Sequence, residues 1–132
     1  MSHYANCLIE PETFPLWEAP DVSRCVTPLI TPDSCGSNRM VTGLWRLYPG
    51  HESDQDIHPD ADEIYYVVSG EGTFVLGKET YTVRQGMTVF IPANVPHQSF
   101  NNGEEDLVYY YIFAPAPSGP SKQEAQGWVK KR

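Results

Sequence analysis

Prolines and glycines interrupt this chain so often that no long regular element fits between them. The sequence has 12 prolines and 10 glycines among its 132 residues. No window of about a dozen residues keeps a helical period of apolar side chains without one of them inside it. Because both residue types break helices, the chain must be assembled from short extended segments. We therefore expect an all-β domain.

The segments between these breaks have the β-branched and aromatic composition of strands. The expected strands are residues 39–48, 64–68, 73–76, 81–83, 87–91, 97–100 and 107–113. The turn sequence Ser69-Gly70-Glu71-Gly72 predicts that the strands on either side of it form a hairpin. Short strands at this spacing are typical of an antiparallel sandwich or barrel.

The length is that of one domain, and we divide it into a barrel and two less regular ends. Residues 1–38 are expected to be an N-terminal arm with one strand at residues 24–30. Five prolines and many apolar side chains within residues 8–38 indicate that this arm lies against its own barrel or a partner subunit. Residues 39–114 form the barrel and residues 115–132 a short C-terminal tail.

Charge and hydropathy limit the partners that we expect. Nine lysines and arginines against 17 aspartates and glutamates give a net charge of −8, which argues against a nucleic-acid partner. No apolar run approaches the ~20 residues that span a bilayer, and the N-terminus lacks the pattern of a signal peptide. The three cysteines are odd in number and lack C-x-x-C spacing, which favours a reducing compartment. We expect a cytoplasmic protein without a membrane partner.

Two of the four histidines, His51 and His58, lie in the most acidic stretch of the chain. A calcium loop of the EF-hand type does not fit there, because its sixth position, counted from Asp54, is Pro59 instead of glycine. Residues two apart on a strand share a face, so Asp56 and His58 would point the same way. The remaining acidic residues of this stretch are expected to form a solvated loop.

The same parity applies to two later strands. Glu63 would share a side with Tyr65, and His97 would lie at the start of another strand. If these strands are neighbours, four side chains converge inside the barrel: Asp56, His58, Glu63 and His97. Two imidazoles and two carboxylates suit a divalent transition metal. The alternative is that each histidine is an ordinary hydrogen-bonded surface or core residue.

The spacing of these residues resembles the first motif of the cupin superfamily. That motif is glycine, five residues, histidine, one residue, histidine, three or four residues, glutamate, six residues and glycine. This chain matches its positions with Gly50, Asp56, His58, Glu63 and Gly70. The one departure is Asp56, which stands where the motif has its first histidine.

A second cupin motif follows at the correct separation. It is glycine, five residues, proline, one residue, glycine, two residues, histidine, three residues and asparagine. This chain matches it with Gly86, Pro92, Asn94, His97 and Asn101. Asn94 replaces a glycine, and asparagine also tolerates the left-handed turn. The chain is therefore identified as resembling the cupin superfamily over most of its middle part.

This resemblance implies an antiparallel jelly-roll β-barrel with a metal held at Asp56, His58, Glu63 and His97. The aspartate leaves either a retuned site with harder ligands or a site that has lost its metal. We expect the metal to be retained, because two histidines and one carboxylate still form the facial triad of non-haem iron enzymes. Fe(II) is the first expectation, with Mn(II), Zn(II), Ni(II) and Co(II) as other candidates.

Other side chains are candidates for catalysis or packing. Tyr65 and Tyr109 have the parity to face the interior, where either donates a hydrogen bond to a substrate or packs in the core. His51 follows the first motif glycine and is a candidate general base on a loop. Arg39 and Arg46 are expected to face solvent.

Small cupins include dioxygenases, decarboxylases, isomerases, lyases and polyketide cyclases. The resemblance therefore implies a metal-dependent enzyme for a small, oxygen-rich substrate, with dioxygenase as the first expectation. An isomerase, lyase, decarboxylase or cyclase is the alternative, and a non-catalytic sugar-binding cupin is a rival from another class. The resemblance also favours a homodimer in which residues 8–38 contribute to the interface.

Overall fold

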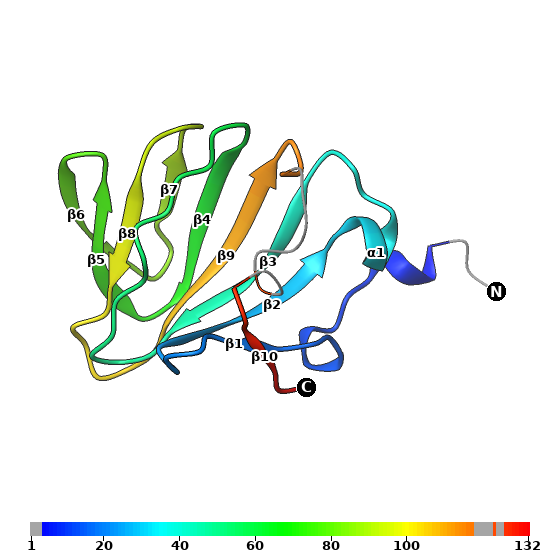
Figure 1. Cartoon of the computed structure of the whole chain (residues 1–132), viewed down its shortest axis with the longest axis horizontal. Helices are drawn as coiled ribbons and strands as arrows, with labels where there is room; N and C mark the ends of the chain where they lie inside the picture. The colour runs from blue at the N-terminus through cyan, green and yellow to red at the C-terminus, as the bar shows by residue number, and fades with distance from the viewer. Residues whose placement is uncertain (1–3, 118–122, 124–125) are drawn as a thin grey trace.

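The computed structural model describes residues 4–117, 123 and 126–132, and these form two antiparallel sheets (Figure 1). The strands are β1 (Trp17–Glu18), β2 (Arg24–Ile30), β3 (Val41–Leu47), β4 (Asp62–Ser69), β5 (Glu71–Leu76), β6 (Glu79–Arg84), β7 (Thr88–Ile91), β8 (His97–Phe100), β9 (Leu107–Ala114) and β10 (Val129–Lys130). The larger sheet has the order β10-β1-β2-β3-β9-β4-β7, and the smaller has the order β6-β5-β8. The predicted all-β jelly roll is confirmed.

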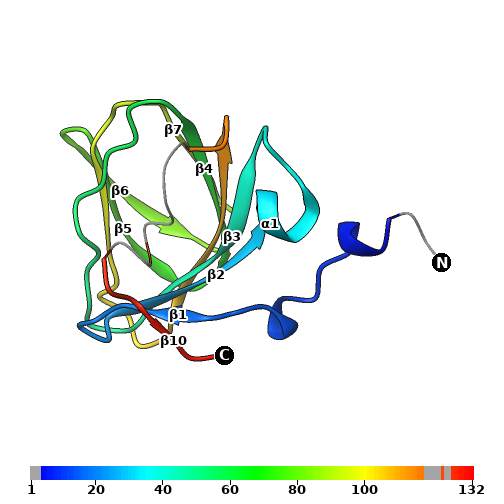
Figure 2. The same ribbon diagram turned by 45° about the vertical axis from the view of Figure 1, so that its right-hand side comes forward.

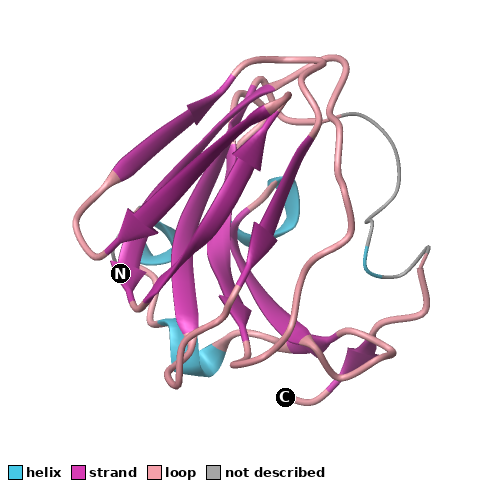
Figure 3. Ribbon diagram, turned by 90° about the vertical axis from the view of Figure 1, so that its left-hand side faces the viewer, coloured by secondary structure: helices cyan, strands magenta, loops and turns pink. Residues whose placement is uncertain are grey.

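Helical turns occupy little of the chain, as the prolines and glycines require (Figure 3). Those whose bounds lie within the described residues are the 3-10 turns η1 (Ala5–Cys7) and η2 (Pro11–Thr13) and the helix α1 (Pro32–Cys35). The Thr31 side chain caps α1 by accepting a hydrogen bond from the Ser34 amide, and Gly36 ends it in the left-handed region. None of the described helices is long and apolar enough to cross a membrane. The thiols of Cys7, Cys25 and Cys35 are free.

The core lies between the two sheets. Its buried members come from both sheets and are Leu47, Val67, Phe74, Val83, Ile91, Leu107 and Tyr109. On β4, Glu63 and Val67 are buried whereas Tyr66 and Val68 are exposed. The predicted parity of β4 is therefore confirmed, and the strand presents Glu63 to the interior of the barrel.

The predicted hairpin between residues 64–68 and 73–76 is wrong. β4 pairs with β7 and β9, whereas β5 pairs with β6 and β8, so the chain changes sheets between them. Gly70 allows this crossing, with φ of +85° and a backbone so close to Asp106 that a Cβ would overlap its carbonyl oxygen. A turn sequence indicates that the chain changes direction, but it does not indicate with which strand each flanking strand pairs.

The segment predicted as an N-terminal arm contributes to the larger sheet. The strand expected at residues 24–30 is confirmed as β2, which pairs with β1 and β3. Pro28 lies within β2, and the register against β3 shifts between Pro28 and Ile30. At the other end of the chain, β10 pairs with β1 (Figure 2). The contact of this segment with a partner subunit stays a prediction.

Candidate metal centre

Three side chains that the sequence predicts as metal ligands meet inside the barrel. Glu63 comes from β4, His97 from β8, and His58 from the loop before β4. The Glu63 Oε1 atom lies 3.5 Å from His58 Nε2 and 3.3 Å from His97 Nε2. One ligand atom from each residue lies within 4.8 Å of the others. These residues come together across the two sheets, not on three neighbouring strands as the prediction supposed.

Backbone contacts explain why the two motifs meet. Asn94 has φ of +67°, the left-handed conformation predicted for the position of the motif glycine. In that conformation its amide donates a hydrogen bond to the His58 carbonyl oxygen at 2.8 Å. The backbones of Asp56 and His97 also exchange two hydrogen bonds, of 2.8 Å and 2.9 Å. The loop that carries His58 is therefore fixed against the segment that carries His97.

The orientation of His97 directs one ring nitrogen into the cluster. Its Nδ1 lies 3.1 Å from the Val95 carbonyl oxygen, which can only accept, so this nitrogen carries the proton. Its Nε2 then presents a lone pair to the cluster, and this buried atom makes no hydrogen bond within the described part of the chain. A backbone carbonyl that fixes the tautomer in this way is common behind metal-bound histidines.

The electrostatics of the cluster favour a cation. Burial by itself lowers the pKa of His97, but contacts with the Glu63 carboxylate, the Val95 carbonyl and Asp56 raise it by more, so the net shift is upward. Glu63 is itself only 3% exposed. Two imidazoles and one carboxylate are the donor set of a facial triad, so the residues present fit a divalent transition metal.

Asp56 lies beside this cluster without completing it. Its backbone pairs with His97, and it lines the same cavity as His58 and Glu63. Among the described side chains, those of His58, Glu63 and His97 have ligand atoms within 4.8 Å of one another. The role of Asp56 as a fourth ligand stays a prediction.

The cluster opens on a cavity of about 540 Å³. Aromatic side chains form much of its wall, and they are Trp17, Trp45, Tyr65, Tyr111, Phe113 and Trp128. The ring of Phe113 meets the ring of His58 edge-on, with centroids 4.7 Å apart. The cavity is therefore large enough for a small organic molecule whose apolar surface contacts these rings.

The predicted catalytic candidates occupy three different environments. Tyr65 lines the cavity, and burial together with the Glu63 charge raises the pKa of its hydroxyl well above the usual value, so it keeps its proton. Tyr109 is fully buried, and its hydroxyl lies 2.9 Å from Ser99 Oγ, which is a core role. The His51 side chain is exposed and outside the cavity lining, so the structure gives no support to a catalytic role for it.

Sequence reasoning missed Arg24, which is 7% exposed and lines the cavity from β2. Arg39 and Arg46, which were weighed instead, are exposed as expected. The signal was present in the alternation of β2, because Arg24, Val26 and Pro28 share one face and all line the cavity. Applying strand parity to residues 24–30 would have found Arg24.

A jelly roll with a cluster of two histidines and one carboxylate in its interior defines a class of small barrels with side chains that could hold a metal. The model of the family described as "Cupin domain" matches residues 43–113, and the chain belongs to that family. The match spans both motifs and every residue of the cluster.

Similar proteins agree with this assignment. An uncharacterized protein of Streptomyces coelicolor is 39% identical over 60% of this chain and 73% of its own length. The polyketide synthase CurC of Streptomyces cyaneus is 30% identical over 70% of this chain and 60% of its own length. A Thermotoga maritima structure described as a predicted oxalate decarboxylase has a TM-score of 0.72 and covers 82% of this chain and 98% of its own. Because only 18% of the aligned residues are identical, this similarity shows a shared fold and nothing more.

Proposed function

We propose that this protein is a metal-dependent enzyme acting on a small, oxygen-rich organic molecule, with non-haem Fe(II) dioxygenase activity as the leading reaction. The observation that carries the proposal is the cluster of His58, Glu63 and His97 on the wall of an aromatic cavity. This donor set leaves coordination positions open on a metal, as the facial triad does in iron oxygenases.

Different residues would have different roles in such a site. His58, Glu63 and His97 would hold the metal, and a bound divalent ion supplies Lewis acidity for a developing oxyanion and, as Fe(II), a position for dioxygen. Tyr65 keeps its proton and lines the cavity, so its hydroxyl is suited to donate a hydrogen bond to a substrate oxygen. The aromatic wall excludes water from the reacting groups.

A second candidate is a reaction without net oxidation, namely that of a cyclase, isomerase, lyase or decarboxylase. The similarity to CurC supports it, because that relative is named as a polyketide synthase. The same three ligands would serve such a reaction, since stabilising an enolate or carboxylate oxygen needs only a Lewis acid. The two candidates therefore differ in whether dioxygen is consumed.

Metal analysis and oxygen uptake test both candidates. Protein purified without chelator is expected to carry close to one first-row divalent metal per chain. Fe(II)-loaded protein is then mixed with a panel of catechols, enediols and β-dicarbonyl acids in an oxygen electrode. Oxygen uptake that stops when the metal is removed supports the dioxygenase, and product formation without uptake supports the second candidate. Protein that neither contains nor binds Fe(II), Mn(II), Zn(II), Co(II) or Ni(II) would refute both.

A further inference from the structure

Arg24 places a buried positive charge in the wall of the cavity. Its side chain is 9% exposed, and it lines both the cavity of the metal cluster and an adjoining hollow of about 290 Å³. Among the described residues that line the larger cavity, it is the one arginine or lysine. The acidic side chains of that lining are Asp33, Asp56 and Glu63, and a divalent metal at the cluster would neutralise the last two. Arg24 would then be the cationic group that meets a ligand.

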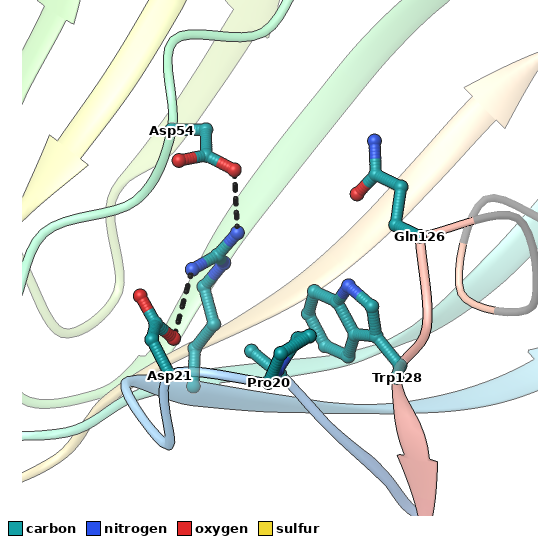
Figure 4. Close-up of a pocket in the computed structure, with 7 residues that line it drawn as sticks. Pro20, Asp21, Asp54, Gln126 and Trp128 are labelled. Carbon is teal, nitrogen blue, oxygen red and sulfur yellow. Dashed lines mark hydrogen bonds and ion pairs between the residues drawn. The ribbon is translucent and has the colours of Figure 1, made fainter.

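The partners of Arg24 are carboxylates that remain in contact with solvent. Its Nη2 donates a hydrogen bond of 3.0 Å to Asp54, and its Nη1 lies 3.7 Å from Asp21, as the dashed lines in Figure 4 show. The side chain of Asp54 is 78% exposed and that of Asp21 is 66% exposed. Ion pairs with such exposed partners are weak, so an incoming anion can replace them.

The rest of the contacts hold the guanidinium in place. Nη1 donates a hydrogen bond of 2.7 Å to Ser23 Oγ, and the guanidinium carbon lies 5.2 Å from the centroid of the Trp128 ring. Arg24 lines the same cavity of about 540 Å³ as His58 and Glu63 of the metal cluster. One small organic ligand in that cavity can therefore contact both the guanidinium and the cluster.

We propose that Arg24 is a specificity-determining residue that selects substrates carrying a carboxylate remote from the oxygens at the metal cluster. The inference rests on the proposed function and names the substrate class, an aromatic, oxygen-rich acid. The ring packs against the aromatic wall, and the planar guanidinium pairs with the carboxylate, which takes the place of Asp54. The metal cluster binds the opposite end of the molecule.

The test compares two probes that differ in this charge and in one methyl group. Dihydrocaffeate carries a catechol and a remote carboxylate, and its methyl ester lacks the negative charge. Binding of both to protein loaded with Zn(II), which permits no redox turnover, is measured by titration calorimetry. The wild type is expected to prefer the acid by at least about tenfold, the scale of a charge-assisted hydrogen bond.

Three variants locate the source of that preference. Arg24→Gln is expected to weaken binding of the acid to the level of the ester while leaving the ester unchanged. Asp54→Asn removes the competing carboxylate and is expected to increase the preference for the acid. Arg46→Gln is the matched control, because Arg46 is an exposed arginine paired with Asp106 at 2.9 Å and lies outside the cavity lining. It is expected to keep the wild-type preference.

Several outcomes overturn the inference. These are equal binding of acid and ester by the wild type, an equal loss for both probes in Arg24→Gln, and a preference unchanged in Asp54→Asn. If Arg24→Gln does not fold, the Asp54→Asn result decides alone. Zinc content separates this inference from the proposed function. A wild type that takes up no zinc refutes the metal site, whereas an acid preference that still depends on Arg24 supports the anion subsite.

Discussion

Two walls of the cavity hold buried charge in different ways. On the wall that carries His58 and Glu63, Glu63 and its neighbour His97 are each only 3% exposed, so both partners of the contact are buried. On the wall formed by Trp17, β2 and Trp128, the Arg24 side chain is 9% exposed, but its acidic partners Asp21 and Asp54 are largely solvated. One wall encloses a pair, and the other encloses only the cation.

This difference separates a fixed site from an exchangeable one. Removing the Glu63 carboxylate from water is costly, and the cost is recovered only when further ligands or hydrogen bonds complete the group. The cluster around Glu63 therefore has the character of a site completed by a metal. Solvent already screens the charges of Asp21 and Asp54. Replacing the Asp54 carboxylate beside Arg24 with the carboxylate of a ligand therefore changes the stability of the protein little.

The largest effect is expected from breaking the enclosed cluster. His97→Ala removes a ligand, and we expect metal affinity to fall by more than about 100-fold, because even changes behind the ligands commonly cost about 10–100-fold. Competition with a chromophoric chelator measures the loss, and circular dichroism checks the fold.

The matched control is His51→Ala, since His51 is an exposed histidine outside the cavity lining. It is expected to keep the metal affinity and activity of the wild type. Full metal content in His97→Ala, or an equal loss in both variants, would contradict the assignment of the cluster.

A smaller effect is expected at Asp56, which lies beside the cluster. If its carboxylate is a ligand, Asp56→Ala should lower metal affinity by about 10–100-fold while the barrel stays folded. Asp56→His restores the residue type of the family motif and should keep the metal, with a changed preference among ions. The same chelator competition applies, and an Asp56→Ala protein with full affinity and rate would define a site of three ligands.

Much of the barrel could be predicted because local chemistry determines it. The strand at residues 97–100 has the predicted bounds, and the left-handed turn at Asn94 occurs where the motif requires it. The failure at Ser69–Gly72 has a clear cause. Turn residues specify a bend, whereas the choice between pairing with β5 and pairing with β9 depends on packing between sheets, which no local window contains.

The residues of the candidate site also fall into those that the sequence predicts and those that depend on tertiary packing. His58, Glu63 and His97 could be predicted because two spaced motifs bring them together. Tyr109 has the same parity as cavity residues, and its full burial, with a stack on Tyr65 at 4.3 Å between centroids, shows that it belongs to the core. Arg24 lies outside both motifs, and strand parity over residues 24–30 places it on one face with Val26. That this face lines the cavity depends on the pairing of β2 with β3, which no local window contains.

The smallest effect concerns the ends of the chain, where a homodimer stays our prediction. Residues 4–16 precede β1 and include Leu8, which is 83% exposed, so they offer apolar surface to a second copy. Because β1 and β2 belong to the sheet, the informative variant removes only residues 1–16 and leaves every strand in place. Light scattering of the full chain should give about twice 14.9 kDa, and the trimmed chain should dissociate toward a monomer. A full chain that is monomeric at micromolar concentration, or a trimmed chain that dimerises equally well, would show that this segment belongs to its own barrel alone.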